Sequence, residues 1–194
     1  MATVREIVNR TSLQLVDPAQ AEWRFEEIVD WINEAVASIY SAAPALSMRT
    51  TQLTVTPGRN ELPVQYTSLV TVDAIKTPTG VKHGLRLLDW GTLDAFDPNW
   101  RSVTGEPTGY LVREQDPRAF WLYPQPPAST VADVTAIAEP AKVVDPADVL
   151  PVPEQYVPAV TDFVLSRAYL KNGDVAGAAE RAQVHMNNFM ARLS

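Results

Sequence analysis

The distribution of proline most strongly constrains how this chain can fold. The sequence of 194 residues has 16 prolines, and ten of them lie between Pro107 and Pro158, whereas residues 19–43 and 159–194 contain none. Proline lacks a backbone N–H and its ring clashes with the preceding helical turn, so it is excluded from helix interiors. Long helices are therefore expected near both ends of the chain, with strands and loops between them.

Apolar spacing predicts two helices at each end of the chain. Near the N-terminus a helical pattern over residues 4–15 ends at Asp17-Pro18, and a stronger amphipathic pattern follows within EWRFEEIVDWINEAVASIY. Near the C-terminus a helix is expected to begin at Pro153, and a second one, capped by Asp174, to end at Leu193. On the strong N-terminal helix the expected core face comprises Ile28, Trp31, Ile32, Ala35 and Ile39.

The middle of the chain changes to the two-residue period of strands. Alternation or β-branched residues predict strands at 51–55, 69–75, 110–114, 119–123 and 131–138. The sequence QDPR between the third and fourth of these favours a type I turn with Asp116 and Pro117 at its first two positions. A short helix after an Asp89 cap is also expected. These short strands with tight turns indicate an antiparallel sheet or a small sandwich.

The predicted fold class is α+β. The N- and C-terminal helix pairs are expected to form one antiparallel four-helix bundle, with an antiparallel β-domain inserted between them. The expected domains are residues 1–45 plus 152–194 for the bundle and residues 46–151 for the β-rich part with its long loops.

The sequence shows no pattern typical of catalysis or metal binding. It has no cysteine, no glycine-rich phosphate loop and no nucleophile motif, and its two histidines, His83 and His185, lack partners at ligand spacing. We therefore expect no catalytic residues, no metal and no cofactor. Carboxylates from distant segments, or a hydrolase that uses either histidine, remain open alternatives. No membrane span is expected, and the net charge of −7 disfavours tight binding to nucleic acid.

Several segments together resemble one protein family. They are Trp23 followed closely by EEIVDWINEAVASI, then LLDWGTLDAFDPNWRSVTGEPTGYLV, then AFWLYPQPP, and finally DFVLSRAYLKNGDVAGAAERAQVHMNNFMARL. In this order and spacing the chain resembles the head-to-tail adaptor, or connector, proteins of tailed bacteriophages. The likeness covers most of the chain, although no single motif in it is specific.

The resemblance implies a non-enzymatic structural protein of the virion neck, assembled in the host cytoplasm. It implies a ring, usually of twelve copies, that binds the portal protein above and a downstream tail protein below. Genome DNA would pass through such a ring without sequence-specific binding. Many adaptors reach into the portal with a C-terminal extension, whereas the last helical pattern here continues to Leu193. The helix end with Met190, Arg192 and Leu193 is therefore the candidate for facing the portal.

Aromatic residues of the middle region are candidates for contacts with a neighbouring subunit or partner. They are Trp90, Trp100, Trp121 and Tyr123, together with Arg101. Trp and Arg are enriched among residues that anchor interfaces. The strand position of Trp121 favours the core, whereas the irregular loop around Trp100 favours a subunit interface. The alternative function is a free-standing protein- or glycan-binding module that uses the same aromatics.

Overall fold

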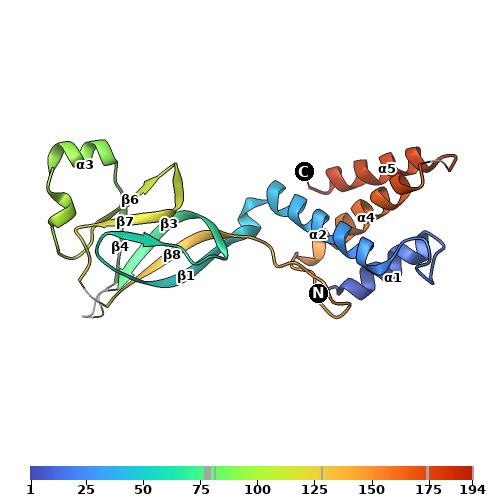
Figure 1. Ribbon diagram of the computed structural model, residues 1–194, viewed down its shortest axis with the longest axis horizontal. Helices are drawn as coiled ribbons and strands as arrows, with labels where there is room; N and C mark the ends of the chain where they lie inside the picture. Colours follow the sequence, from blue (N-terminus) through green and yellow to red (C-terminus); the bar gives the residue numbers. More distant parts are fainter. Residues whose placement is uncertain (77–79, 81, 128, 174, 194) are drawn as a thin grey trace. The chain divides into compact units, whose positions relative to one another are not determined.

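The computed structural model describes residues 1–76, 80, 82–127, 129–173 and 175–193. The chain forms two compact units (Figure 1). The helical unit combines Met1–Leu46 with Pro140–Ser194, and the β unit comprises Ser47–Glu139. Each unit encloses its own cluster of buried apolar side chains, so each has the core that an independent fold requires. No helix within the described residues is long and apolar enough to cross a membrane.

The helical unit contains four α-helices. They are α1 (Val4–Gln14), α2 (Phe25–Ala42), α4 (Val157–Lys171) and α5 (Ala178–Ala191), with a 3-10 turn, η3 (Glu154–Tyr156), before α4. A capping box starts α1: the Thr3 hydroxyl accepts the Glu6 N–H at 3.3 Å, and the Glu6 carboxylate accepts the Thr3 N–H at 3.2 Å. The predicted cap of the last helix, Asp174, lies outside the described residues; α5 begins after Gly177.

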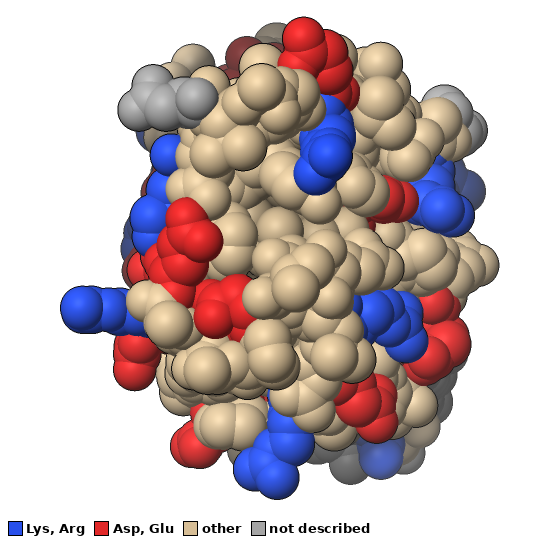
Figure 2. Space-filling view, turned by 90° about the vertical axis from the view of Figure 1, so that its right-hand side faces the viewer, with Lys and Arg blue, Asp and Glu red and all other residues tan. Residues whose placement is uncertain are grey.

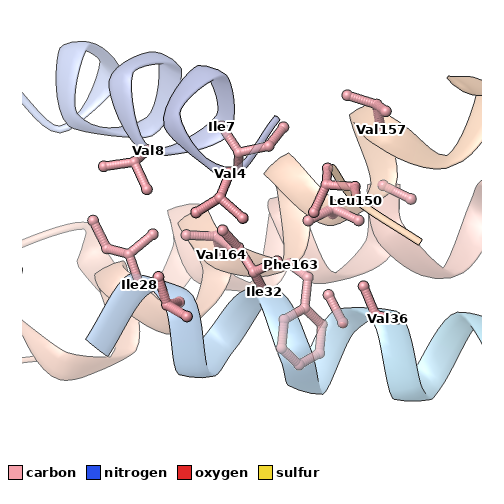
Figure 3. Close-up of a cluster of buried hydrophobic side chains, with 14 of the residues drawn as sticks. Val4, Ile7, Val8, Ile28, Ile32, Val36, Leu150, Val157, Phe163 and Val164 are labelled. Carbon is pink, nitrogen blue, oxygen red and sulfur yellow. The ribbon is translucent and has the colours of Figure 1, made fainter. Parts of the chain in front are cut away.

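Helix α4 is the centre of the helical unit. Residues 159–166 are all buried, which covers two consecutive turns and therefore every side of the helix. Helices α1, α2 and α5 each pack against α4. Figure 3 shows Phe163 and Val164 among apolar side chains from α1 and α2, including Ile7 and Ile32. A helix that is apolar all round is stable only when other elements enclose it.

The segment that returns from the β unit also belongs to the helical core. Val143, Leu150 and Val152 are buried. Asn33 of α2 fixes this segment at Val143 by two hydrogen bonds, one from its amide N–H₂ to the carbonyl oxygen (2.9 Å) and one from the backbone N–H to its amide oxygen (3.0 Å). The Leu150 N–H donates to the Ala2 carbonyl at 3.0 Å. These bonds satisfy the backbone of a segment that has no helix or strand of its own.

The β unit consists of two four-stranded sheets. The first has the order β1-β8-β3-β4, and the second has the order β2-β7-β6-β5. The strands are β1 (Met48–Val55), β2 (Arg59–Glu61), β3 (Tyr66–Lys76), β4 (Lys82–Gly84), β5 (Arg86–Leu87), β6 (Gly109–Arg113), β7 (Asp116–Tyr123) and β8 (Thr130–Ala138). All pairs are antiparallel except β5 with β6, which is parallel.

The two sheets pack face to face around a core of alternating side chains. Val72 of β3 and Val134 of β8 face Phe120 and Leu122 of β7 in one buried cluster. Alternate residues of a strand point to opposite faces, so Trp121 and Tyr123 point to the other side of the second sheet. That other side is covered by α3 (Trp90–Phe96) and the 3-10 turn η2 (Trp100–Ser102).

The structure corrects the predicted fold class. The chain is α+β, but it is not an antiparallel four-helix bundle with an inserted antiparallel β-domain. Helix α4 is a buried centre with α5 packed chiefly on it, whereas a bundle places four equivalent helices around a shared core. The strands form two separate four-stranded sheets with one parallel pair, and a fifth helix, α3, covers one of them. Two sheets form because the strands carry enough alternating apolar residues to enclose a second core.

Replacing Ile32 by Ala should strongly destabilise the helical unit. Ile32 is fully buried between α2 and α4, and truncating such a side chain leaves a cavity that lowers the free energy of unfolding by about 2–5 kcal/mol. Thermal unfolding followed by the helical circular dichroism signal measures the change. Asp30→Ala, an exposed change on the same helix, is the matched control and should shift stability by no more than about 0.5 kcal/mol.

Candidate interaction surface

Helix α3 starts at the cap that the sequence predicts. The Asp89 carboxylate accepts hydrogen bonds from the Thr92 N–H at 2.7 Å and the Thr92 hydroxyl at 2.9 Å. These bonds, the backbone one first, hold the pKa of Asp89 below its ordinary value, so the cap stays ionised. The cap fixes the direction in which α3 leaves the sheet, and Trp90 is its first residue.

The four aromatic candidates form one cluster on the outer face of the second sheet. The ring centroids of Trp90 and Trp121 are 5.0 Å apart, those of Trp90 and Trp100 are 5.4 Å apart, and those of Trp100 and Tyr123 are 6.4 Å apart. All three pairs meet edge to face, which is a favourable geometry for aromatic rings. The structure thus brings together residues from α3, η2 and β7 that are as far as 33 positions apart in sequence.

Trp100 is the fully buried member of this cluster. Only 1% of its surface is exposed, so its indole fills the interior of its own β unit. The indole Nε1–H donates to Asp94 Oδ1 at 2.7 Å, and Arg101 Nη1 donates to the same oxygen at 3.0 Å. One carboxylate on α3 therefore holds both the buried Trp and the exposed Arg of η2.

The remaining part of the cluster faces outward. Trp90 and Trp121 are half-buried, and two guanidinium groups lie over the rings. The Arg113 carbon Cζ is 4.3 Å from the Trp90 centroid and 5.4 Å from that of Trp121, and the Arg101 Cζ is 4.5 Å from that of Trp100. We call Trp90, Arg101, Arg113, Trp121 and Tyr123 the Trp–Arg face. Arg101 is paired with Asp94, whereas Arg113 forms no ion pair within the described part of the chain.

Arg113 and Asp94 are members of this site that sequence reasoning missed. Arg113 follows Leu111 by two positions on β6, and Leu111 pairs with Trp121 on β7. Strand alternation places both side chains on the face of Trp121, so this signal was available once the pairing of the two strands was known. Asp94 carried no such signal, because its contact with Trp100 depends on the path of the loop between α3 and η2.

Hydrogen bonds and burial shift the pKa values of two acidic groups in the site, the Asp94 carboxyl and the Tyr123 phenol. The Trp100 N–H, followed by Arg101, lowers the pKa of Asp94, which keeps this carboxylate charged. Burial, followed by the charge of Asp97, raises the pKa of the Tyr123 phenol. Its hydroxyl lies 3.4 Å from Asp97 Oδ2 and donates to it. The Trp–Arg face therefore combines fixed cations and a neutral phenol with aromatic rings.

The candidate portal-facing residues lie at the end of α5 in different environments. Met190 is 59% exposed, whereas Leu193 is partly buried against the helical core. Arg192 Nε donates to Asp162 Oδ2 of α4 at 3.0 Å. His185 Nδ1 lies 2.9 Å from the other oxygen of Asp162. Asp162 thus fastens α5 to α4, a role that sequence reasoning missed because this acid lies in a largely apolar helix.

Both histidines contact other residues of the protein. His83 Nε2 lies 2.9 Å from the Pro107 carbonyl oxygen, and its Nδ1 lies 3.4 Å from Glu106 Oε1. The His185 ring stacks on Tyr169, with centroids 5.8 Å apart. Within the described residues, no group of three or more His, Asp or Glu side chains is arranged to hold a metal ion.

Comparison with known proteins places this chain in a family. The family model described as SU10 adaptor protein matches residues 2–194. The chain belongs to the SU10 adaptor protein family. A search of curated proteins gives no match. The predicted resemblance to head-to-tail adaptors of tailed phages is therefore confirmed by a match over almost the whole sequence.

As an SU10 adaptor, the protein is a structural component of the phage neck, and adaptors of this kind interact with portal and tail proteins. This role gives the Trp–Arg face a context. Half-buried Trp and exposed Arg side chains on a hydrogen-bonded support are suited to binding other proteins.

Replacing Trp100 by Ala should lower the stability of the isolated protein, because the indole is buried in its own subunit. The expected loss in the free energy of unfolding is roughly 3–5 kcal/mol, measured by urea denaturation. Trp100→Phe keeps a ring but removes the bond to Asp94, so its loss should be smaller. Phe96→Ala, at an 84% exposed position on α3, is the control and should change stability little. Wild-type stability in Trp100→Ala would contradict the interior position.

Replacing Asp94 by Asn should remove an acid-sensitive contribution to stability. The folded-state pKa of Asp94 is lowered, so its ionised form stabilises the fold above the unfolded-state value of about 4, and this contribution is lost as pH falls below that value. Denaturation over a pH series should show the variant less stable than wild type near neutrality and equal to it in acid. Glu114→Gln, in the exposed β6–β7 turn, is the control. A difference that persists unchanged in acid would contradict this assignment.

Proposed function

We propose that this adaptor forms a closed ring beneath the portal, extends the DNA channel toward the tail, and presents a docking platform to the next tail component. Membership of the adaptor family supports the position in the neck. The observation that carries the rest is the Trp–Arg face. It is a group of half-buried aromatic rings in edge-to-face contact, with a guanidinium over them.

A ring requires each subunit to bind its neighbour through two different surfaces. In our proposal one of these surfaces is the Trp–Arg face. Arg113 lies over two indoles and forms no ion pair with a carboxylate of the described residues, so a neighbour can supply one without disrupting an ion pair seen in the structure. Trp100 then acts from beneath, because its burial and its bond to Asp94 fix the positions of Trp90 and Arg101. The proposed ring has twelve copies, as the resemblance implies.

Net charge agrees with a channel that does not retain DNA. The chain carries a formal charge of −7, so a ring of many copies repels the phosphate backbone. In the proposed role the genome passes through the ring without sequence-specific contacts, and the ring assembles in the host cytoplasm before the tail is added. The exposed Met190, beside the fastened Arg192 and Leu193, is the proposed contact with the portal.

Arg113→Glu should weaken ring assembly and leave the folded monomer intact. The exposed guanidinium has no ion pair to lose among the residues that the structure describes, and a carboxylate would repel the acceptor proposed on the neighbour. Co-expression with the portal, purification and electron microscopy measure ring formation, and thermal unfolding measures the monomer. Arg86→Glu, an exposed change on β5 of the same sheet, is the matched control and should assemble normally.

Two results would contradict the proposal in different ways. If purified virions lack this protein, the proposed position and function are wrong. If rings form with wild-type yield from Arg113→Glu, the protein is still a ring adaptor, but the Trp–Arg face is not a subunit contact. A hit on a glycan array that requires Trp121, without portal association, would favour a binding module.

A further inference from the structure

One end of the helical unit has a hollow that no part of the family assignment explains. Its volume is about 160 Å³, and it lies where the end of α1, the segment before α2, the end of α4 and the start of α5 meet. We call it the end hollow; its main lining residues are Leu15, Trp23, Tyr169, Val175, Ala178 and Arg181. Figure 2 views the molecule from this end and shows mostly uncharged residues around a central depression, with charged residues toward the edge.

The end hollow has fixed walls. The Asp17 carboxylate accepts backbone N–H groups from Ala21, Glu22 and Trp23 at 2.9, 2.9 and 3.2 Å, which fixes the segment between α1 and α2. The Trp23 indole N–H donates to the Ala168 carbonyl of α4 at 3.3 Å. The hollow is therefore preformed, and a partner that enters it does not have to order the walls.

The chemistry of the hollow defines what fits it. The walls combine apolar side chains with the polar Asn172 and Arg181, and the Arg181 guanidinium has its Cζ 5.7 Å from the Tyr169 centroid. Arg181 forms no ion pair with any residue that the structure describes. An apolar cavity of about 150 Å³ holds one benzene ring. The matching occupant is a phenyl-sized side chain that has a carboxylate beside it.

The same chain displays such a group on its β unit. Phe96, the last residue of α3, is 84% exposed and is the only aromatic among the strongly exposed apolar side chains of the described residues. Asp97 follows it directly; its carboxylate accepts the Tyr123 hydroxyl at 3.4 Å and the Asn99 N–H at 3.2 Å, but it has no cation partner among the described residues. The helix that carries Phe96 is held by the Asp89 cap and by the bond from Trp100 to Asp94. We call Phe96 with Asp97 the Phe96 knob.

We propose that the Phe96 knob of one subunit inserts into the end hollow of the next subunit, where Arg181 pairs with Asp97. Size and charge both match: a single phenyl ring for a hollow of about 160 Å³, and a carboxylate for a guanidinium that has no ion pair among the described residues. Knob and hollow are different surfaces of one chain, so the contact is heterologous and repeats from copy to copy. This inference rests on the proposed ring and names a contact that joins its subunits.

The absence of cysteine in the sequence allows a direct test by disulfide trapping. Phe96→Cys protein and Val175→Cys protein, each the only thiol in its chain, are mixed, assembled with the portal and oxidised. Val175 lines the hollow and is 60% exposed, so a thiol there is accessible. A disulfide-linked dimer that contains one copy of each variant, resolved by mass spectrometry, is expected. Leu87→Cys mixed with Val175→Cys is the matched control, since Leu87 is exposed on the same unit, and it should yield no mixed dimer.

Phe96→Ala provides a second measurement. It should reduce the yield of rings several-fold while leaving the unfolding of the monomer unchanged, because the side chain makes little contact within its own subunit. Rings that assemble normally without the mixed disulfide would overturn the knob-and-hollow contact and leave the ring itself standing. A Phe96→Cys disulfide to the portal or to a tail protein would also overturn it, since another partner then occupies the knob. Failure of wild-type protein to form rings with the portal would instead overturn the proposed function.

Discussion

The burial of α4 is the constraint on which the helical unit depends. Eight consecutive residues, 159–166, are buried, so this helix is stable only when α1, α2, α5 and the returning segment enclose it. The enclosing elements come from both ends of the sequence, which explains why the chain must return after forming the β unit. Polar side chains in this interior are therefore few. Asp162 is matched by His185 and Arg192, whereas the buried Ser166 hydroxyl has no hydrogen-bond partner among the described residues.

In the β unit, one buried tryptophan fixes the path of a long irregular segment. The stretch from Asp97 to Tyr110 contains little regular structure, yet it follows a defined path because Trp100 is anchored under α3. The same anchor supports the half-exposed rings and guanidinium groups above it. Interior packing and surface chemistry are thus coupled: the outer face can be rigid because its support is apolar and hydrogen-bonded. Rigid aromatic anchors lose little conformational entropy on binding, which suits a protein that joins other proteins.

Local signals in the sequence predicted single elements well, and nonlocal arrangement poorly. The apolar stripe of Ile28, Trp31, Ile32, Ala35 and Ile39 predicted α2 and its buried face, although Trp31 is only partly buried, and Asp89 predicted the start of α3. The predicted turn at Asp116-Pro117 was wrong: the turn is at residues 114–115 and both residues belong to β7, because the register with β6 decides where the hairpin closes. The division into two sheets and the central place of α4 depend on contacts between distant segments, which no local period encodes.

For the candidate site too, the sequence indicated residue types but not how they are arranged in space. Residue type singled out these aromatic residues as interface candidates, but only the structure shows that Trp100 is buried in the cluster while Trp90 and Trp121 reach the surface. The position of Arg113 on the same face as Trp121 could be inferred only once the pairing of β6 with β7 was known. The family resemblance, which uses order and spacing along the whole chain, carried functional information that single residues did not.

The fastening of α5 at Asp162 has a mechanical consequence. Both carboxylate oxygens of this nearly buried acid are engaged, one by His185 and one by Arg192, which lie on successive parts of the same helix. A force applied at the end of α5 is thus shared by two contacts with α4, one at His185 and one at Arg192, so the helix does not detach from its end alone. In the ring that we propose, such a two-point attachment resists rupture better than a single terminal contact would.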